Sequence, residues 1–201
     1  MSDDNVKKLE VIATIKEGVE IGVKNIGPIL VNLILWILTV WIPYLNVGTT
    51  IGLFVGIVSK ASRGEAISFT EIFDAKYRRY MGEFFLVCGL VYIGVFLGII
   101  FLIIPGIIIA LAWCFAPLIT IDKGKNPAEA ITLSNNVTYG NKGRIFGINF
   151  LVCLVVSIVS TIFALIPVVG FVLSLIISLF AIFVSIGLQA SMYKQLAGDI
   201  R

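Results

Sequence analysis

Three long stretches of this chain contain no charged residue, and the charged residues gather between them. The stretches run from Asn25 to Ser59, from Phe84 to Ile121 and from Ile145 to Tyr193. The 15 Lys and Arg residues and the 12 Asp and Glu residues all lie in the four remaining segments. Apolar sequence of this length is typical of membrane-spanning helices. The pattern therefore predicts an all-α integral membrane protein.

Each stretch is too long for one simple crossing of a bilayer. The second has 38 residues, from Phe84 to Ile121. As one helix it would measure about 57 Å, whereas the hydrocarbon core is about 30 Å thick. A proline lies near the middle of every stretch, at Pro43, Pro105 and Pro167. Because proline interrupts helices, we expect a turn at each, the second at Pro105-Gly106. The sequence thus predicts six transmembrane helices in three proline-turned hairpins.

The placement of charge favours hairpins over kinked single spans. Three hairpins keep all charged segments on one side, whereas three kinked spans would place them alternately on two sides. The positive-inside rule makes the charged side cytoplasmic, which predicts a cytoplasmic (inner) membrane protein with both termini in the cytoplasm. Re-entrant hairpins, which return without crossing, place the charges in the same way and stay an alternative. The aromatic residues Trp36, Trp41 and Tyr44 near the first turn favour full crossing, because such residues mark membrane interfaces.

The three prolines are evenly spaced, at intervals of 62 residues, and each follows an isoleucine. A fixed period predicts a repeated structural unit. Here the unit would be an amphipathic cytoplasmic helix followed by a hairpin, within a single membrane domain that covers residues 1–201. The repeats would cover residues 1–62, 63–124 and 125–201.

The charged connecting segments have the pattern of capped helices. In SFTE, Ser68 is placed to cap a helix while Glu71 bonds back to it. In NPAE, Asn126 is a suitable N-cap, Pro127 suits the first helical position and Glu129 completes the box. We expect these helices to lie along the cytoplasmic membrane surface or to cover the end of the bundle.

Three glycines form a GxxxGxxxG face in the second predicted helix, at Gly48, Gly52 and Gly56. Glycines four residues apart let another helix backbone approach closely. The face is either an oligomer interface or a packing surface inside the bundle, and the sequence favours internal packing.

The motif YRRY combines aromatic and basic residues at the predicted cytoplasmic interface. It consists of Tyr77, Arg78, Arg79 and Tyr80. These side chains are candidates for contact with anionic lipid headgroups. The alternative, which we favour, is ordinary anchoring of the protein at the membrane surface.

The predicted spans contain polar residues but no ionisable residue, which argues against proton-coupled transport and pumping. Asn32, Asn149 and Gln189 are the candidates for a neutral polar pathway. Side chains of this kind more often form hydrogen bonds between helices.

Little in the chain points to catalysis, a metal or a cofactor. Histidine is absent, and Cys88, Cys114 and Cys153 are too far apart for metal or redox spacing, so we expect packing roles for them. No nucleotide-binding or hydrolase motif occurs. Asp122 and the other acids at the ends of predicted helices have no partner constellation in the sequence. We therefore expect no enzymatic activity, no cofactor and no nucleic-acid partner.

The segment from Pro105 to Gly147 resembles the membrane domain family attached to some glycerophosphoryl diester phosphodiesterases, and its stand-alone relatives of unknown function. The matching positions are Pro105, Gly106, Asp122, Ala130, Ser134, Gly140 and Phe146. In the fused proteins a separate soluble domain carries the phosphodiesterase chemistry, and this chain has no room for one. The resemblance implies an accessory membrane protein that acts near lipid metabolism or transport, and it identifies no substrate.

Together these patterns predict a non-enzymatic multi-pass protein, a structural or accessory component of the cytoplasmic membrane. The alternative is a transporter or channel for a neutral or lipid-like solute. The expected partners are membrane lipids and either a second copy of the chain or another membrane protein.

Overall fold

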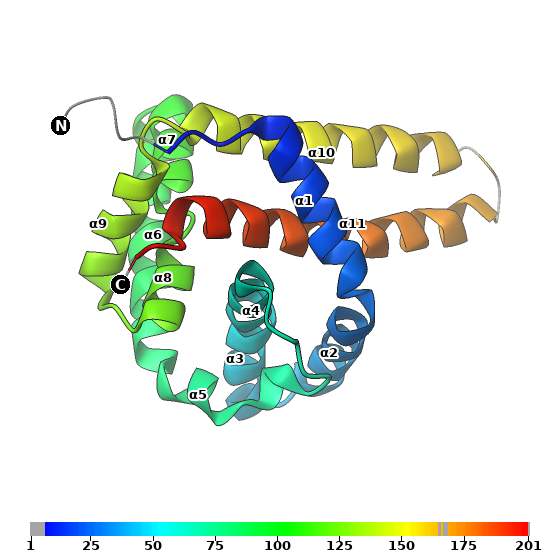
Figure 1. The fold of residues 1–201 in the computed structure, drawn as a ribbon, viewed down its shortest axis with the longest axis horizontal. Coiled ribbons are helices and arrows are strands. Elements are labelled where there is room, and N and C mark those ends of the chain that lie inside the picture. Colours follow the sequence, from blue (N-terminus) through cyan, green and yellow to red (C-terminus); the bar gives the residue numbers. More distant parts are fainter. Residues whose placement is uncertain (1–6, 165, 167–168, 201) are drawn as a thin grey trace.

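A computed structural model describes residues 7–164, 166 and 169–200, and this part of the chain is helical and contains no strand (Figure 1). The all-α prediction is confirmed. In chain order the elements are α1 (Val11–Lys24), α2 (Ile26–Thr39), α3 (Pro43–Ile51), the π-helix η2 (Gly52–Gly56), α4 (Ile57–Arg63), the 3-10 helix η3 (Glu71–Phe73), α5 (Ala75–Arg79), α6 (Met81–Phe101), α7 (Ile103–Trp113), α8 (Ala116–Lys123), α9 (Pro127–Thr138), α10 (Lys142–Ala164) and α11 (Val169–Ala197).

Five helical segments in the described residues are long and apolar enough to cross a membrane. They are Pro43–Arg63, Met81–Phe101, Ile103–Lys123, Lys142–Ala164 and Val169–Ala197. A sixth arises if α1 and α2, which meet at a bend of 69°, count as one broken span. Helix α2 alone has 14 residues, which is short of the ~17 that a crossing needs. The structure thus supports a multi-pass membrane protein.

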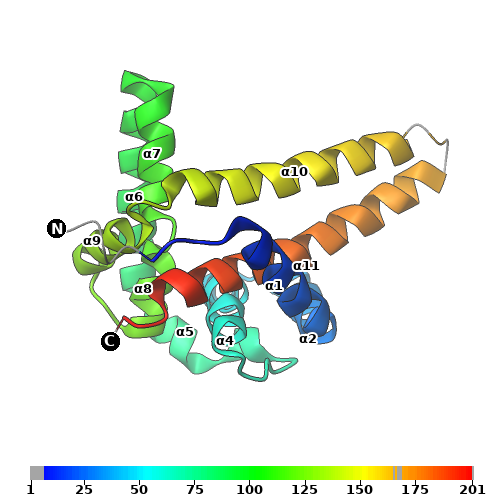
Figure 2. The same cartoon turned by 45° about the horizontal axis from the view of Figure 1, so that its top comes forward.

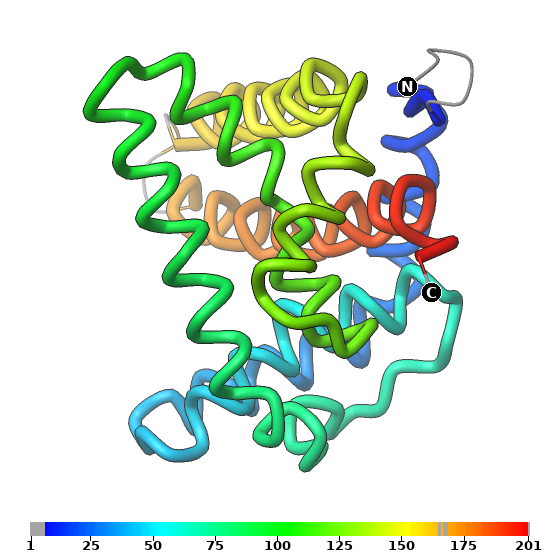
Figure 3. The backbone as a smooth tube through the Cα atoms, turned by 90° about the vertical axis from the view of Figure 1, so that its left-hand side faces the viewer, coloured from blue at the N-terminus to red at the C-terminus, as the bar shows by residue number. Residues whose placement is uncertain are grey.

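The short helices gather at one end of the apolar helices, and we call this part the hub. It consists of α4, η3, α5, α8 and α9 with the adjoining ends of α1, α10 and α11. The pairs α6–α7 and α10–α11 project from the hub in different directions (Figures 2 and 3). Only 11% of the most apolar window of α6, and of α10, is buried. Such apolar surface needs a lipid environment, because few soluble monomers expose patches of this extent.

Two of the three predicted proline turns lie in the described residues. Pro43 is the first residue of α3 and follows the turn at residues 40–42. The second turn lies at Leu102, whose backbone is extended, so it precedes the predicted Pro105-Gly106 by three residues. Pro105 fits inside the first turn of α7, because backbone N–H groups there have no intrahelical acceptor and the N–H that proline lacks is not needed. Pro167 lies outside the described residues.

Gly106 serves close packing of α6 against α7 rather than the turn. A methyl group on Gly98 of α6 would come within 2.8 Å of the Cα atom of Gly106. The two backbones therefore touch directly beside the turn, which brings the two apolar helices together from their first residues.

The connecting segments differ in how well the sequence predicts them. Asn126 caps α9 as predicted, because its Oδ1 accepts the Glu129 N–H at 2.9 Å. The helix ends at Thr138, two residues before the left-handed Gly140. The predicted capping box of Ser68 and Glu71 is wrong. Glu71 lies buried in η3 and bonds to other side chains instead.

Helix α1 crosses α11 through glycines on both helices. A methyl group on Gly187 would lie 1.9 Å from the carbonyl oxygen of Gly18 and 2.7 Å from the nitrogen of Gly22. Gly18 and Gly22 form a GxxxG pair on α1. Any side chain at the crossing would force the two helices apart.

We expect Gly187→Ala to destabilise the protein, because its new methyl group has no room against α1. Overpacking of this kind costs about 1–3 kcal/mol, which corresponds to a decrease in Tm of roughly 2–10 °C for a chain of this size. Thermal unfolding of the detergent-purified protein measures the effect. Gly89→Ala on α6 is the matched control, since a methyl group there meets open space. An unchanged Tm for Gly187→Ala would contradict the close crossing.

Candidate functional site

Two carboxylates are buried in the hub, at Asp122 and Glu71. Their side chains are 4% and 2% exposed. A buried carboxylate is costly unless it is paired and hydrogen-bonded, and such groups often mark functional positions. We therefore take the surroundings of these two residues as the candidate site.

Asp122, at the end of α8, connects three helices. One carboxylate oxygen accepts hydrogen bonds from Ser59 and Arg63, which lie one turn apart on α4. The other oxygen accepts from the Tyr193 hydroxyl of α11 at 3.0 Å. The carboxylate thus has a neutralising cation and two hydroxyl donors, and it fixes the positions of α4, α8 and α11 relative to one another.

Glu71 joins η3 to α4 and α5 in a similar way. Its Oε2 accepts from the Lys60 ammonium at 2.7 Å, and its Oε1 accepts from the Tyr77 hydroxyl at 2.7 Å. The Lys76 ammonium lies 3.6 Å from the same Oε1. Both buried carboxylates therefore combine a basic side chain with a tyrosine hydroxyl.

The charge state of the Glu71 cluster is fixed at neutral pH. Burial alone would raise the pKa of Glu71, but the Lys60 ammonium and the Tyr77 hydroxyl outweigh it, so this pKa lies below its ordinary 4.5. Burial first, and then the bond to Glu71, raise the pKa of Tyr77 far above its ordinary 10. Neither group is poised to exchange a proton near pH 7, which suits a structural clamp better than acid–base catalysis.

A cavity of about 220 Å³ lies between the two carboxylate clusters. Its lining consists of Gly56, Ser59, Arg63, Lys76, Tyr77, Ile121 and Asp122. The charged groups around it are already bonded to one another. Across residues 7–164, 166 and 169–200, no group of three or more His, Cys, Asp or Glu is placed to hold a metal ion.

The start of α1 is held by side chains at the α9–α10 connection. The side chain of buried Asn141 accepts from the Leu9 N–H at 2.9 Å and donates to the Lys7 carbonyl at 2.6 Å. Arg144 donates to the Leu9 carbonyl at 2.9 Å. Lys7 also forms an ion pair with Asp199, so a side-chain contact links the two described ends of the chain.

The middle of α1 is bonded to the end of α11. Glu17 accepts from Ser191 and Lys194 at 2.7 Å each and from Gln195 at 3.1 Å. Together with the glycine crossing, these bonds fix α1 across α11.

The predicted glycine face is occupied by the chain itself. A methyl group on Gly48 would meet the Arg78 side chain at 2.7 Å, and one on Gly52 would meet the Ile72 backbone at 2.7 Å. Gly56 faces the Tyr77 ring. The segment η3–α5 thus fills the groove, which supports internal packing and leaves no room for a second copy on this face.

The four residues of YRRY do not form one surface. Tyr77 is buried and bonded to Glu71, and Arg78 packs on Gly48. Arg79 is exposed and Tyr80 is half-buried. Of the four, Arg79 keeps the exposure that contact with a lipid headgroup requires.

The three predicted pathway residues lie in two places. Asn32 is buried and donates to the Ser68 carbonyl at 2.7 Å while accepting from the Ile72 N–H at 3.1 Å, so it anchors the loop before η3. Asn149 and Gln189 come together at a cavity of about 210 Å³, which Cys114, Phe115, Leu118, Ile145 and Met192 also line. Asn32 takes no part in that cavity.

Sequence reasoning missed the partners of Asp122, although the charge pattern holds a signal for them. Ser59 ends the first uncharged run, Asp122 follows the second directly and Tyr193 ends the third. Helix pairs that return to one side of a membrane bring these three run ends to the same depth. Comparison of the whole chain with protein-family models, curated proteins and solved structures finds no match.

We expect loss of the Asp122 carboxylate to weaken the hub strongly. In Asp122→Leu the Tyr193 hydroxyl loses its acceptor and the Arg63 guanidinium loses the buried one of its two carboxylate partners, and breaking such a pair costs about 3–5 kcal/mol. Thermal unfolding in detergent should show a decrease in Tm of roughly 6–20 °C. Glu20→Ala, at an exposed acid within α1, is the control and should change little. Equal Tm values for the two variants would contradict the clamp.

The Glu71 cluster predicts acid sensitivity. Because the folded-state pKa of Glu71 is below its unfolded value, its stabilising effect is complete above about pH 4.5 and is lost as pH falls through the folded pKa. The wild-type Tm should therefore fall more steeply than that of Glu71→Gln as pH is lowered from about 6 to about 3. Parallel curves would rule out this contribution of Glu71.

Proposed function

We propose that this chain is a non-enzymatic multi-pass protein of the cytoplasmic membrane, a structural or accessory component whose hub lies at the cytoplasmic face. The observation that carries the proposal is the partition of charge. The ion pairs of the described residues lie in the hub or in the loops that join its helices, whereas the outer surfaces of α6, α7, α10 and α11 are apolar. A bilayer that contains the apolar helices, with α4 and α8 as the inner ends of two spans, leaves the charged ends of these helices and the connecting segments of the hub in water.

The orientation follows from the same partition. The pairing of Lys7 with Asp199 is what an even number of crossings requires, since both ends of the described chain lie on one side. The basic residues of the hub make that side cytoplasmic by the positive-inside rule. The proposed layout is six crossings in three hairpins, with the 62-residue repeat as its sequence signature.

The directions of the helix pairs bear on the re-entrant alternative. The pairs α6–α7 and α10–α11 diverge (Figure 2), so crossing one flat bilayer with both requires them to reorient about the hub. If one pair instead lies shallow in the membrane, it is re-entrant. The labelling experiment below tests full crossing against re-entry for the preceding pair, α2–α3.

The chemistry of the hub favours an accessory role over catalysis. The carboxylates of Asp122 and Glu71 both accept hydrogen bonds from a basic side chain and a tyrosine hydroxyl, and these bonds keep the pKa of Glu71 below its ordinary value. A helper of this kind acts by what it contacts. Partners would bind at the exposed cytoplasmic faces of the hub or along the apolar pairs within the bilayer, and membrane lipids are the first of these. This agrees with the lipid-related role that the resemblance to the phosphodiesterase membrane domains implies.

Transport of a lipid-like solute remains a second candidate, supported by an apolar groove between α1, α10 and α11. Transport of a polar solute has less support, because Asn32 is remote from the cavity of Asn149 and Gln189.

Cysteine labelling in intact cells tests the orientation. In a chain whose Cys88, Cys114 and Cys153 are replaced by serine, an impermeant thiol reagent should label Tyr44→Cys but not Ala128→Cys. Tyr44 is 71% exposed near the first turn, and Ala128 is exposed on α9. Labelling of Ala128→Cys would overturn the orientation. Labelling of neither in cells, with both reactive after permeabilisation, would show that the pair α2–α3 is re-entrant.

A further inference from the structure

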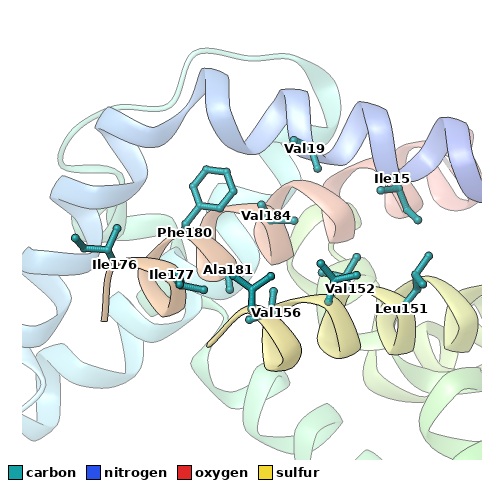
Figure 4. Close-up of a pocket in the computed structure, with 12 residues that line it drawn as sticks. Ile15, Val19, Leu151, Val152, Val156, Ile176, Ile177, Phe180, Ala181 and Val184 are labelled. Carbon is teal, nitrogen blue, oxygen red and sulfur yellow. The ribbon is translucent and has the colours of Figure 1, made fainter. Parts of the chain in front are cut away.

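A groove of about 530 Å³ lies between α1, α10 and α11 (Figure 4). Ile15 and Val19 of α1 form one wall, and valines, isoleucines, Leu151, Phe180 and Ala181 of the α10–α11 pair form the others. Every residue that lines the groove is apolar. An apolar cavity binds water poorly and takes apolar ligands well.

Helix α1 is held over this groove by polar contacts outside it. Leu9, just before the helix, is bound by Asn141 and Arg144 at the α9–α10 connection, and Glu17 is bound by Ser191 and Lys194 on α11. The glycine crossing keeps α1 close to α11. The groove is therefore a built space with a fixed wall, rather than a gap between loosely placed helices.

The groove opens onto the surface that the bilayer would cover. Leu151 and Val155 of α10 are 46% and 52% exposed, and Ile176 and Phe180 of α11 are 57% and 44% exposed. These residues line the groove and also belong to the apolar outer faces of the pair. A molecule already dissolved in the hydrocarbon core can enter from the side without passing through water.

The length of the groove suits one hydrocarbon chain. Its lining on α10 extends from Leu151 to Val159, which is about 12 Å of helix. An acyl chain occupies one leaflet, or about half of the ~30 Å hydrocarbon core. Residues 1–6 are a poor alternative occupant because four of the six are Ser, Asp or Asn.

We propose that the groove between α1, α10 and α11 holds one acyl chain of a membrane phospholipid as a retained ligand, distinct from the exchanging lipid around the protein. The inference rests on the membrane location proposed above. In this proposal, the polar contacts of the hub hold α1 in position as one wall of a lipid-binding site.

Native mass spectrometry of the detergent-purified protein, supplied with a dioleoyl phospholipid and then washed in lipid-free detergent, tests the proposal. The wild type should retain one phospholipid per chain. Ala181→Trp fills the groove from α11 and should reduce the lipid-bound fraction at least tenfold. Val156→Trp fills it from α10 and should do the same, which guards against a single variant that misfolds. Ile182→Trp, the adjacent exposed position outside the lining, should retain lipid as the wild type does.

Three results would overturn the proposal: a wild type that retains no lipid, equal retention by the groove variants and Ile182→Trp, or a lipid-free dimer that Ala181→Trp dissociates. The last would assign the groove to a second copy of the chain. Failure of the membrane proposal is distinguishable, because the labelling experiment reports on orientation whether or not a lipid is retained.

Discussion

The carboxylate of Asp122 is the contact on which the arrangement of the helices depends. It accepts hydrogen bonds from Ser59 and Arg63 of α4 and from Tyr193 of α11. Replacing such a buried pair by apolar residues often leaves stability unchanged or improves it, so its value lies in specificity. Any other register of α4 against α11 would leave a buried charge without its partner. The clamp therefore selects one arrangement among the many that apolar helices allow.

That selection is needed because the hydrophobic effect does not hold helices together inside a bilayer, where lipid is as apolar as leucine. Attraction must come from polar bonds and from close backbone contact, and in and next to the hub this chain places the two together. Gly18 and Gly22 meet Gly187 beside the bonds of Glu17 to α11. Ile72 and Tyr77 pack against Gly52 and Gly56, next to the hydrogen bonds of Glu71. The outer parts of the apolar pairs keep close backbone contacts beside their turns, at Gly98 and Gly106 and at Gly170, and their remaining surface faces lipid.

This division explains which features the sequence could predict. Runs without charge identify apolar helices, and local capping chemistry placed Asn126 correctly, because both depend on neighbouring residues alone. The second turn was predicted at Pro105 but lies at Leu102, because proline is tolerated in the first turn of a helix as well as in a turn between helices. The capping box failed because Glu71 gains more from Lys60 and Tyr77 than from Ser68, and those partners are set by tertiary packing. The contact of Ser59, Asp122 and Tyr193 could have been predicted from the sequence, because all three lie at the ends of uncharged runs.

The same division gives α1 its place in the structure. Its Glu17 is bonded to the end of α11 and its glycines pack on α11, while the apolar Ile15 and Val19 face the α10–α11 pair. A helix held at its start and at its crossing cannot settle further onto α10 without breaking one of those contacts. The space beneath it is thus a consequence of how the hub is bonded. In water such a space would favour collapse of the surrounding helices, whereas in a bilayer one acyl chain can occupy it and keep it open.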